Sequence, residues 1–314
     1  MCIRDSDNCL ATTLTAQYRF REAESCYAQA LQRAQAANLE VTLAEIECNL
    51  GCLALYQGRF DQALDNLERS RRRYAVLDMP HELAIAEQEL ADAYLELNMA
   101  PEAAAIYARV TPRFAELGMP GEQARALAYH GRACVVLGQG EQARTLLSEV
   151  ARIFAATDMP VGAAITRLTE AQLDLQQDGD YAAAAAALTA VEPVFAAVHA
   201  AGWLLQTRWL AGVLAHRQGN LDEARERLTA ALADAQAAMI AQVAQRCATE
   251  LGLVALAAGD ATEAESRFRQ AVTLTEAMRA PLPAEEFQIG FIGDKLNSSY
   301  LTPFLKPAPS QLLA

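Results

Sequence analysis

The chain has 314 residues, a formal net charge of −13 and 53% hydrophobic residues, with aromatics at only 6%. This charge argues against nucleic acid or an anionic membrane as the main partner, because both would repel the surface. No apolar run approaches the roughly 20 residues that span a bilayer. Seven cysteines at irregular spacings do not resemble a disulfide framework, so we expect a cytoplasmic protein.

The first six residues differ in kind from the rest. Residues 1–6 lack the basic start and apolar stretch of an export signal. The DNA that would encode them resembles a transposon end used to prepare sequencing libraries. We therefore expect 1–6 to be a non-native leader.

Two landmarks recur along the remaining chain. Met79-Pro80, Met119-Pro120 and Met159-Pro160 share one forty-residue spacing. The second landmark is a turn residue with the same period. It occurs at Gly58, Asn98 and Gly138, and then, after one inserted residue, at Gly179, Gly219 and Gly259. A period of 20–50 residues is typical of solenoids. The predicted hairpin units are 7–40, 41–80, 81–120, 121–160, 161–200, 201–241 and 242–281, with turns near 18–21, 58–60, 98–101, 138–140, 179, 219 and 259.

Unit 41–80 shows the pattern most clearly. Residues 41–57 and 61–77 are predicted helices, joined by a turn at 58–60. Gly58 suits the left-handed conformation that ends the first helix, and Asp61 is expected to cap the second. Met79-Pro80 then ends the unit, because proline disfavours helix in the residue before it.

Three positions of the repeat carry the same type of residue in nearly every unit, and we call each set of equivalent residues a column. A small residue allows two helices to approach closely at Ala11, Gly51, Ala91, Gly131, Gly212 and Gly252, with Gln172 as the expected exception. An alanine follows at Ala23, Ala63, Ala103, Ala143, Ala184, Ala224 and Ala264. Four residues later comes a large apolar side chain: Tyr27, Leu67, Tyr107, Leu147, Leu188, Leu228 and Phe268.

This pattern resembles the tetratricopeptide repeat (TPR), in which a Leu-Gly pair, a turn glycine, an alanine and a bulky residue recur through two antiparallel helices. Leu50-Gly51, Gly58, Ala63 and Leu67 carry the resemblance. It covers about 7–281 and implies an all-α fold, a right-handed superhelical solenoid of about seven helical hairpins. The forty-residue unit is longer than the usual ~34.

No enzyme signature is present. The chain has no phosphate-binding loop, no GxGxxG, no GxSxG and no HExxH motif. Cys48 and Cys52 share a helix face but lack further metal ligands, and packing is the favoured interpretation. Cys134 lies one turn from His130, yet its place inside a repeat helix also favours packing. We therefore expect no catalytic, cofactor or metal site, and a protein that is not an enzyme.

The resemblance places any binding surface on the concave side, which the first helix of each hairpin lines. Trp209 is the best anchor candidate, although packing between repeats is an open alternative. The absence of lysine from the repeats argues against the carboxylate clamp of chaperone-binding TPR proteins. The predicted groove residues are Glu45, Cys48, Cys52, Tyr56, Gln88, Asp92, Glu96, Arg125, Arg132, Gln206, Trp209, His216 and Arg246.

The tail, 282–314, leaves the repeat. Residues 287–296 together with Tyr300 resemble the junction after TPR arrays in bacterial CHAT proteins, and a plain capping segment is the alternative. We expect a non-catalytic protein-interaction scaffold, the regulatory or sensing arm of a larger CHAT-type protease. Its partner would be a protein, a peptide or a downstream domain of the same chain, not nucleic acid or membrane. The alternative is the signal-receiving arm of a maltose-regulator-type transcription activator.

Overall fold

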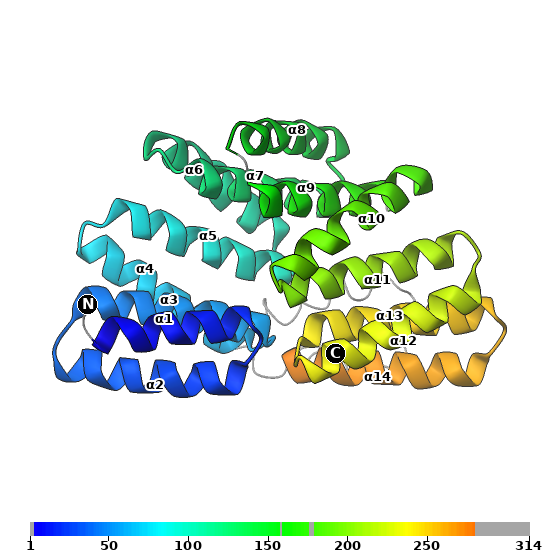
Figure 1. Ribbon diagram of the computed structural model, residues 1–314, viewed down its shortest axis with the longest axis horizontal. Helices are drawn as coiled ribbons and strands as arrows, with labels where there is room; N and C mark the ends of the chain where they lie inside the picture. Colours follow the sequence, from blue (N-terminus) through cyan, green and yellow to red (C-terminus); the bar gives the residue numbers. More distant parts are fainter. Residues whose placement is uncertain (1–2, 158, 176–178, 280–314) are drawn as a thin grey trace, which may run out of the picture. The chain divides into compact units, whose positions relative to one another are not determined.

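The computed structural model describes residues 3–157, 159–175 and 179–279, and over this part of the chain it contains fourteen helices and no strand (Figure 1). The helices form seven consecutive hairpins, which confirms the predicted all-α repeat solenoid. The first helices are α1 (Ile3–Ala16), α3 (Glu40–Tyr56), α5 (Pro80–Glu96), α7 (Pro120–Val136), α9 (Pro160–Leu173), α11 (Ala201–Arg217) and α13 (Ala241–Ala257). The second helices are α2 (Phe20–Ala36), α4 (Phe60–Val76), α6 (Ala100–Glu116), α8 (Gly140–Thr157), α10 (Tyr181–Ala197), α12 (Leu221–Ala237) and α14 (Ala261–Arg279).

The hairpins divide into two compact units. One contains α1 to α8 with the first turn of α9, and the other contains the rest of α9 with α10 to α14, grouped with residues 96–99. Each is held by its own buried alanines and large apolar side chains, among them Ala63 and Leu67 in the first and Ala224 and Leu228 in the second. The predicted alanine column is thus confirmed as core.

Two columns of left-handed residues end the helices. Within hairpins the residue with positive φ is Tyr18, Gly58, Asn98, Gly138, Gly179, Gly219 or Gly259. Between hairpins it is Asn38, Asp78, Gly118, His199 or Met239. The predicted turns are therefore correct. The predicted cap at Asp61 is wrong, since α4 begins at Phe60 with Arg59 at its cap position. Asp180 and Asp260 occupy the equivalent position and do cap their helices.

The small-residue column lies against the bulky residue of the same hairpin. A Cβ added to Gly51 would lie 2.5 Å from Leu67 Cγ, and one at Gly212 would lie 2.5 Å from Leu228 Cγ. At Gly131 the corresponding distance to Leu147 is 3.4 Å, an ordinary contact. The close approach inferred from the sequence is therefore real, and its tightness varies between hairpins.

The exception expected at Gln172 is wrong. Gly51 and Gly131 are each the twelfth residue of their helix, and the twelfth residue of α9 is Ala171, which is wholly buried. The extra residue enters after it, where residues 174–175 adopt π-helical hydrogen bonding and Gly179 N donates to Asp174 O over 2.7 Å. A π-turn is the usual way for a helix to absorb one inserted residue, so the small-residue column stays unbroken.

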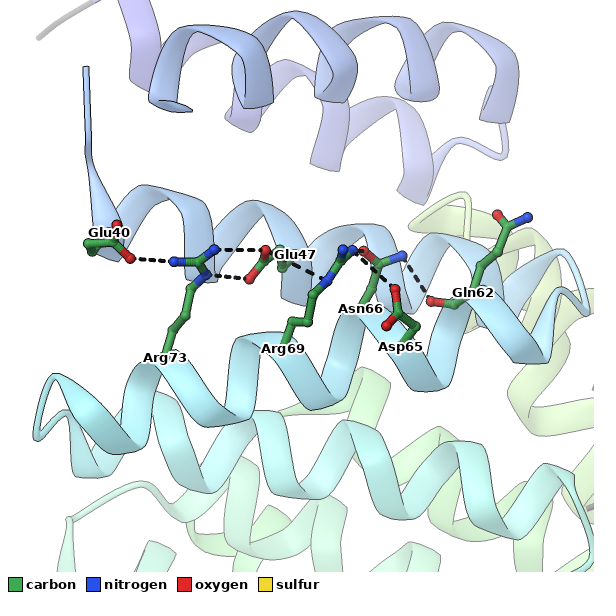
Figure 2. Close-up of polar contacts among 7 residues, drawn as sticks. All are labelled: Glu40, Glu47, Gln62, Asp65, Asn66, Arg69 and Arg73. Atoms are coloured by element: carbon green, nitrogen blue, oxygen red, sulfur yellow. Dashed lines mark hydrogen bonds and ion pairs between the residues drawn. The ribbon is translucent and has the colours of Figure 1, made fainter. Parts of the chain in front are cut away.

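A column of ion pairs ties the two helices of a hairpin together. Glu47 accepts hydrogen bonds from Arg73 (Nε to Oε2, 2.8 Å), and Arg73 also contacts Glu40, as Figure 2 shows. The same spacing of 26 residues separates Asp7 from Arg33, Glu87 from Arg113, and Arg208 from Asp234. The last pair has its charges reversed. An ion pair therefore recurs at this position of the hairpin, whichever of the two helices carries the positive charge.

Helix α4 also carries a basic cluster, Arg69, Arg71, Arg72 and Arg73, whose charges pair within the same network. Arg69 lies 3.4 Å from Asp65 and 3.8 Å from Glu47 (Figure 2). Arg71 and Arg72 both donate to Glu68. Each arginine of the cluster contacts a carboxylate, so the positive charges of this helix face are balanced by neighbouring acidic residues.

Candidate binding site on the first helices

Neighbouring first helices contact each other through residues 37 positions apart. Asn8 Nδ2 donates to Glu45 Oε1 over 2.7 Å, and Arg246 lies 5.4 Å from the ring centre of Trp209. Gln88, in the amide orientation that satisfies its neighbours, accepts from Arg125 Nε over 3.1 Å. Two of these contacts join predicted groove residues of adjacent repeats, and the third joins the predicted Glu45 to Asn8.

The densest polar group lies between α5 and α7, and we call it the Arg125 cluster: Gln88, Glu89, Asp92, Tyr107, Arg125 and Tyr129. Arg125 donates through Nη1 to Glu89 Oε1 and through Nη2 to Asp92 Oδ2, both over 2.6 Å. Glu89 and Asp92 are only 8% and 4% exposed. One guanidinium therefore bridges two buried carboxylates one helical turn apart.

Asp92 also joins the second helix of its own hairpin. Tyr107 on α6 donates its hydroxyl to Asp92 Oδ1 over 2.5 Å. The same spacing of 15 residues brings Tyr27 Oη within 3.2 Å of Thr12 Oγ1. Where the bulky residue of a hairpin is tyrosine, its hydroxyl reaches a polar residue of the first helix. Burial and the neighbouring Asp92 raise the pKa of Tyr107 well above its usual value, so it stays a donor.

Around the cluster lie two thiols, one further tyrosine and a second arginine. The Cys52 thiol lies near Glu89 and Cys48, and Cys48 together with burial raises the pKa of Cys52 well above the ordinary range. Tyr56, on the same helix, is 47% exposed. On α7, Arg125 and Arg132 lie 5.6 and 4.9 Å from the ring centre of Tyr129. Such cation–π contacts orient a guanidinium while leaving its edge able to donate.

In the second unit the predicted residues lie on α11 and α13, apart from Glu96, the last residue of α5. Trp209 is half-buried beneath Arg246. Part of its ring is therefore packed against a neighbouring repeat, as the alternative interpretation expects. His216 Nδ1 lies 2.6 Å from Glu250 Oε1. Gln206 is half-buried one turn before Trp209, on the same helix.

The sequence missed several members of the site. Glu89, Tyr107, Tyr129, Asn8 and Glu250 each contact a predicted residue yet were not selected. The spacings of 37 and 15 residues are the signal that would have found Asn8 and Tyr107. Glu45 is exposed, while Glu96, at the end of α5, is half-buried. The groove residues remain a prediction as a binding surface.

Burial opposes nucleophilic chemistry at Cys134. Burial raises the pKa of Cys134 and lowers that of His130, so each favours its neutral form. A reactive cysteine needs the opposite shift. Within the described residues, no three His, Cys, Asp or Glu side chains are grouped to hold a metal ion. None of the described helices combines the length and apolar character needed to cross a bilayer.

Buried polar side chains concentrate on the first helices. Of fourteen buried polar or charged residues in the described chain, twelve lie on first helices; the exceptions are Ser70 and Thr275. Burying a polar group costs stability unless it is paired. We define the first-helix face of the first unit as Glu45, Asn49, Cys52, Tyr56, Gln88, Glu89, Asp92, Arg125, Tyr129 and Arg132.

Comparison with known proteins finds a repeat family that matches part of the chain and solved structures of similar fold. Residues 3–75 match the tetratricopeptide repeat family. A Rap protein complexed with competence and sporulation factor is similar in structure, with a TM-score of 0.72 and 13% identity over 88% of this chain and 75% of that one. A Rap conjugation gene regulator in complex with a Phr peptide also scores 0.72, at 13% identity, over 87% and 74%.

A more distant structure is a Signal Transduction ATPase with Numerous Domains (STAND) protein with a tetratricopeptide repeat sensor from Pyrococcus horikoshii. Its TM-score is 0.53 at 14% identity, and the match covers 95% of this chain but only 44% of that protein. No curated protein matches the sequence. At these identities the structural likeness shows a TPR-like helical fold.

Proposed function

We propose that this chain is a non-catalytic scaffold that binds a peptide or protein segment on its first-helix face. The observation that carries the proposal is the gathering of buried polar side chains on the first helices. A solenoid stabilised by apolar packing alone has no need of an arginine bridging two buried carboxylates. Such groups are suited to orient a ligand, as polar groups do in binding sites.

The chemistry of the face fits a polypeptide partner. Tyr56 offers a half-exposed aromatic ring at the end of the helix that also carries the polar side chains of Glu45 and Asn49. Aromatic and arginine side chains dominate binding energy in protein interfaces. The peptide-bound Rap regulator, which shares this fold, supports a peptide as the class of ligand.

Selection from a displayed peptide library on the full chain tests this proposal. Kd values of enriched peptides would then be compared for the wild type and Tyr56→Ala. We expect Tyr56→Ala to raise Kd about tenfold, the effect of losing about 1.4 kcal/mol. Val76→Ala is the matched control, since Val76 is 86% exposed and lies on second helix α4. Equal loss in both variants, or none in either, would contradict the proposal.

The finer proposal is that the scaffold is the regulatory or sensing arm of a larger bacterial protein of the CHAT type. The STAND protein with its tetratricopeptide repeat sensor supports a sensing role for such arrays. The junction-like segment 287–300 lies outside the described residues. The genomic reading frame tests the context: a His and Cys peptidase domain after residue 314 supports it. A basic helix-turn-helix there would instead favour the regulator-type alternative.

A further inference from the structure

The Arg125 cluster holds more negative than positive charge at one contact. The carboxylates of Glu89 and Asp92 are both nearly buried and both accept from Arg125. Two ionised carboxylates beside one guanidinium would leave a net negative charge away from water. A buried uncompensated charge is costly, and the cheapest remedy is to bind one proton.

The groups that face Asp92 come from four helices. Glu89 lies one turn away on α5, Tyr107 donates from α6, and Arg125 donates from α7. Tyr129 of α7 adjoins Arg125 and Arg132, a second cation on this side of the cluster, and the Cys52 thiol of α3 lies near Glu89. Asp92 therefore stands at the contact of α5 with both α6 and α7.

The two carboxylates divide their proton unequally. Burial, reinforced by the charge of Glu89, raises the pKa of Asp92 to about 7 despite its contacts with Arg125 and Tyr107. Burial alone would raise the pKa of Glu89 as well, but Arg125 and the Cys52 thiol outweigh it and the pKa falls below its usual value. Asp92 is thus the member of the pair that gains and loses the proton.

We propose that Asp92 is a proton-operated switch at the junction of α5, α6 and α7, with the protonated form holding the three helices most tightly. Loss of the proton places a second negative charge beside Glu89 and loosens the packing of α7 on α5. The device belongs to the free chain and does not require that the first-helix face bind a partner. Its failure would leave the proposed binding function standing, and the reverse also holds.

The sign of the pH dependence follows from linkage. Because the folded pKa of Asp92 lies above the ordinary value of 3.8, its contribution is complete below that value and is lost as pH rises through about 7. The pKa of Glu89 is lowered, so its contribution is present above the ordinary value of 4.5 and is lost as pH falls further. The Asp92 contribution already declines above 3.8 and that of Glu89 is complete by 4.5, so the cluster is most stabilising at roughly pH 4 to 4.5.

Carbon-detected NMR of aspartate carboxyl groups, over pH 4 to 9 in the full chain, tests the switch. Asp92→Asn assigns the signal, and we expect its midpoint near 7 in the wild type. Glu89→Gln should lower that midpoint by at least one pH unit, because it removes the neighbouring charge. Tyr107→Phe should raise it, because the donated hydrogen bond favours the ionised form.

Hydrogen exchange in α5 and α7 supplies the structural readout. After correction for intrinsic rates, protection in these helices should fall severalfold between pH 6 and pH 8 in the wild type. Asp92→Asn, which cannot ionise, should show no such fall. An Asp92 midpoint near 4, or equal protection at both pH values in the wild type, would overturn the proposal. If Asp92→Asn does not fold, the midpoint shift in Glu89→Gln decides the matter.

Discussion

Leu67 occupies the space that a side chain at Gly51 would need: a Cβ there would lie 2.5 Å from Leu67 Cγ. The contact joins α3 to α4 within one hairpin, and Gly212 with Leu228 repeats it in the second unit. Cγ is the branch atom of leucine, so it cannot yield without moving the whole side chain. The glycine therefore sets how closely the two helices approach.

Gly51→Ala should consequently destabilise the chain. Overpacking should cost about 1–3 kcal/mol, partly offset by the roughly 1 kcal/mol gain in helix propensity. Chemical denaturation measures the difference. Gly131→Ala is the matched control, because its added Cβ meets Leu147 at an ordinary 3.4 Å. The control should be neutral or stabilising; an equal loss in both variants would show that steric contact is not the cause.

Ala224→Leu tests the alanine column. Ala224 is wholly buried on α12, so the added atoms should cost about 1–3 kcal/mol. Ala230→Leu, at an exposed position of the same helix, should leave the thermal midpoint nearly unchanged. Identical melting curves for Ala224→Leu and the parent would refute the assigned helix register.

Gly138 isolates the cost of backbone conformation. Its φ is 73°, and a Cβ added there would meet nothing within 4 Å. Gly138→Ala should therefore destabilise by about 1–2 kcal/mol through the left-handed backbone alone. Gly138→Asn should cost less, since asparagine tolerates this conformation and Asn98 adopts it at the equivalent turn. Denaturation curves that rank the two variants in the opposite order would contradict this explanation.

The recurring ion pair predicts that the acidic and basic residues of one hairpin can be exchanged between its two helices. Glu47→Arg or Arg73→Glu alone should destabilise by about 1–2 kcal/mol, since Glu47 is largely buried and Arg73 is about one-third exposed. The double exchange should recover part of the loss, as the reversed pair Arg208–Asp234 suggests, but not all of it, because it leaves Glu40 and Arg69 facing like charges. A double-mutant cycle measures the coupling. Strictly additive losses would show that the pair itself contributes nothing.

The sequence predicted what local rules determine. A fixed period sets the phase of each helix, so the hairpins, the turn at Gly58 and the burial of Ala224 were all predictable. The exception at Gln172 was wrong because an inserted residue can enter a helix at several places. Only the backbone hydrogen bonds near Asp174 show that it enters after Ala171.

The site was less accessible to prediction, because its contacts join different repeats. Arg125 was correctly placed on a first helix, but its bridge to Glu89 and Asp92 depends on how α7 packs on α5. The residue pattern within one repeat predicts on which face of its helix a side chain lies. It does not predict which side chain of the next repeat will contact it. Glu89, one turn from Asp92, was therefore overlooked although it completes the cluster.

The measurement that tests the central claim most directly is site-specific photo-crosslinking of a selected peptide. Benzoylphenylalanine would replace Tyr56 on the first-helix face or Val76 on α4, both exposed in the free chain. A peptide bound to the first-helix face should crosslink from position 56 and not from position 76. Crosslinking from position 76 alone, or equally from both, would contradict the assignment of the binding surface.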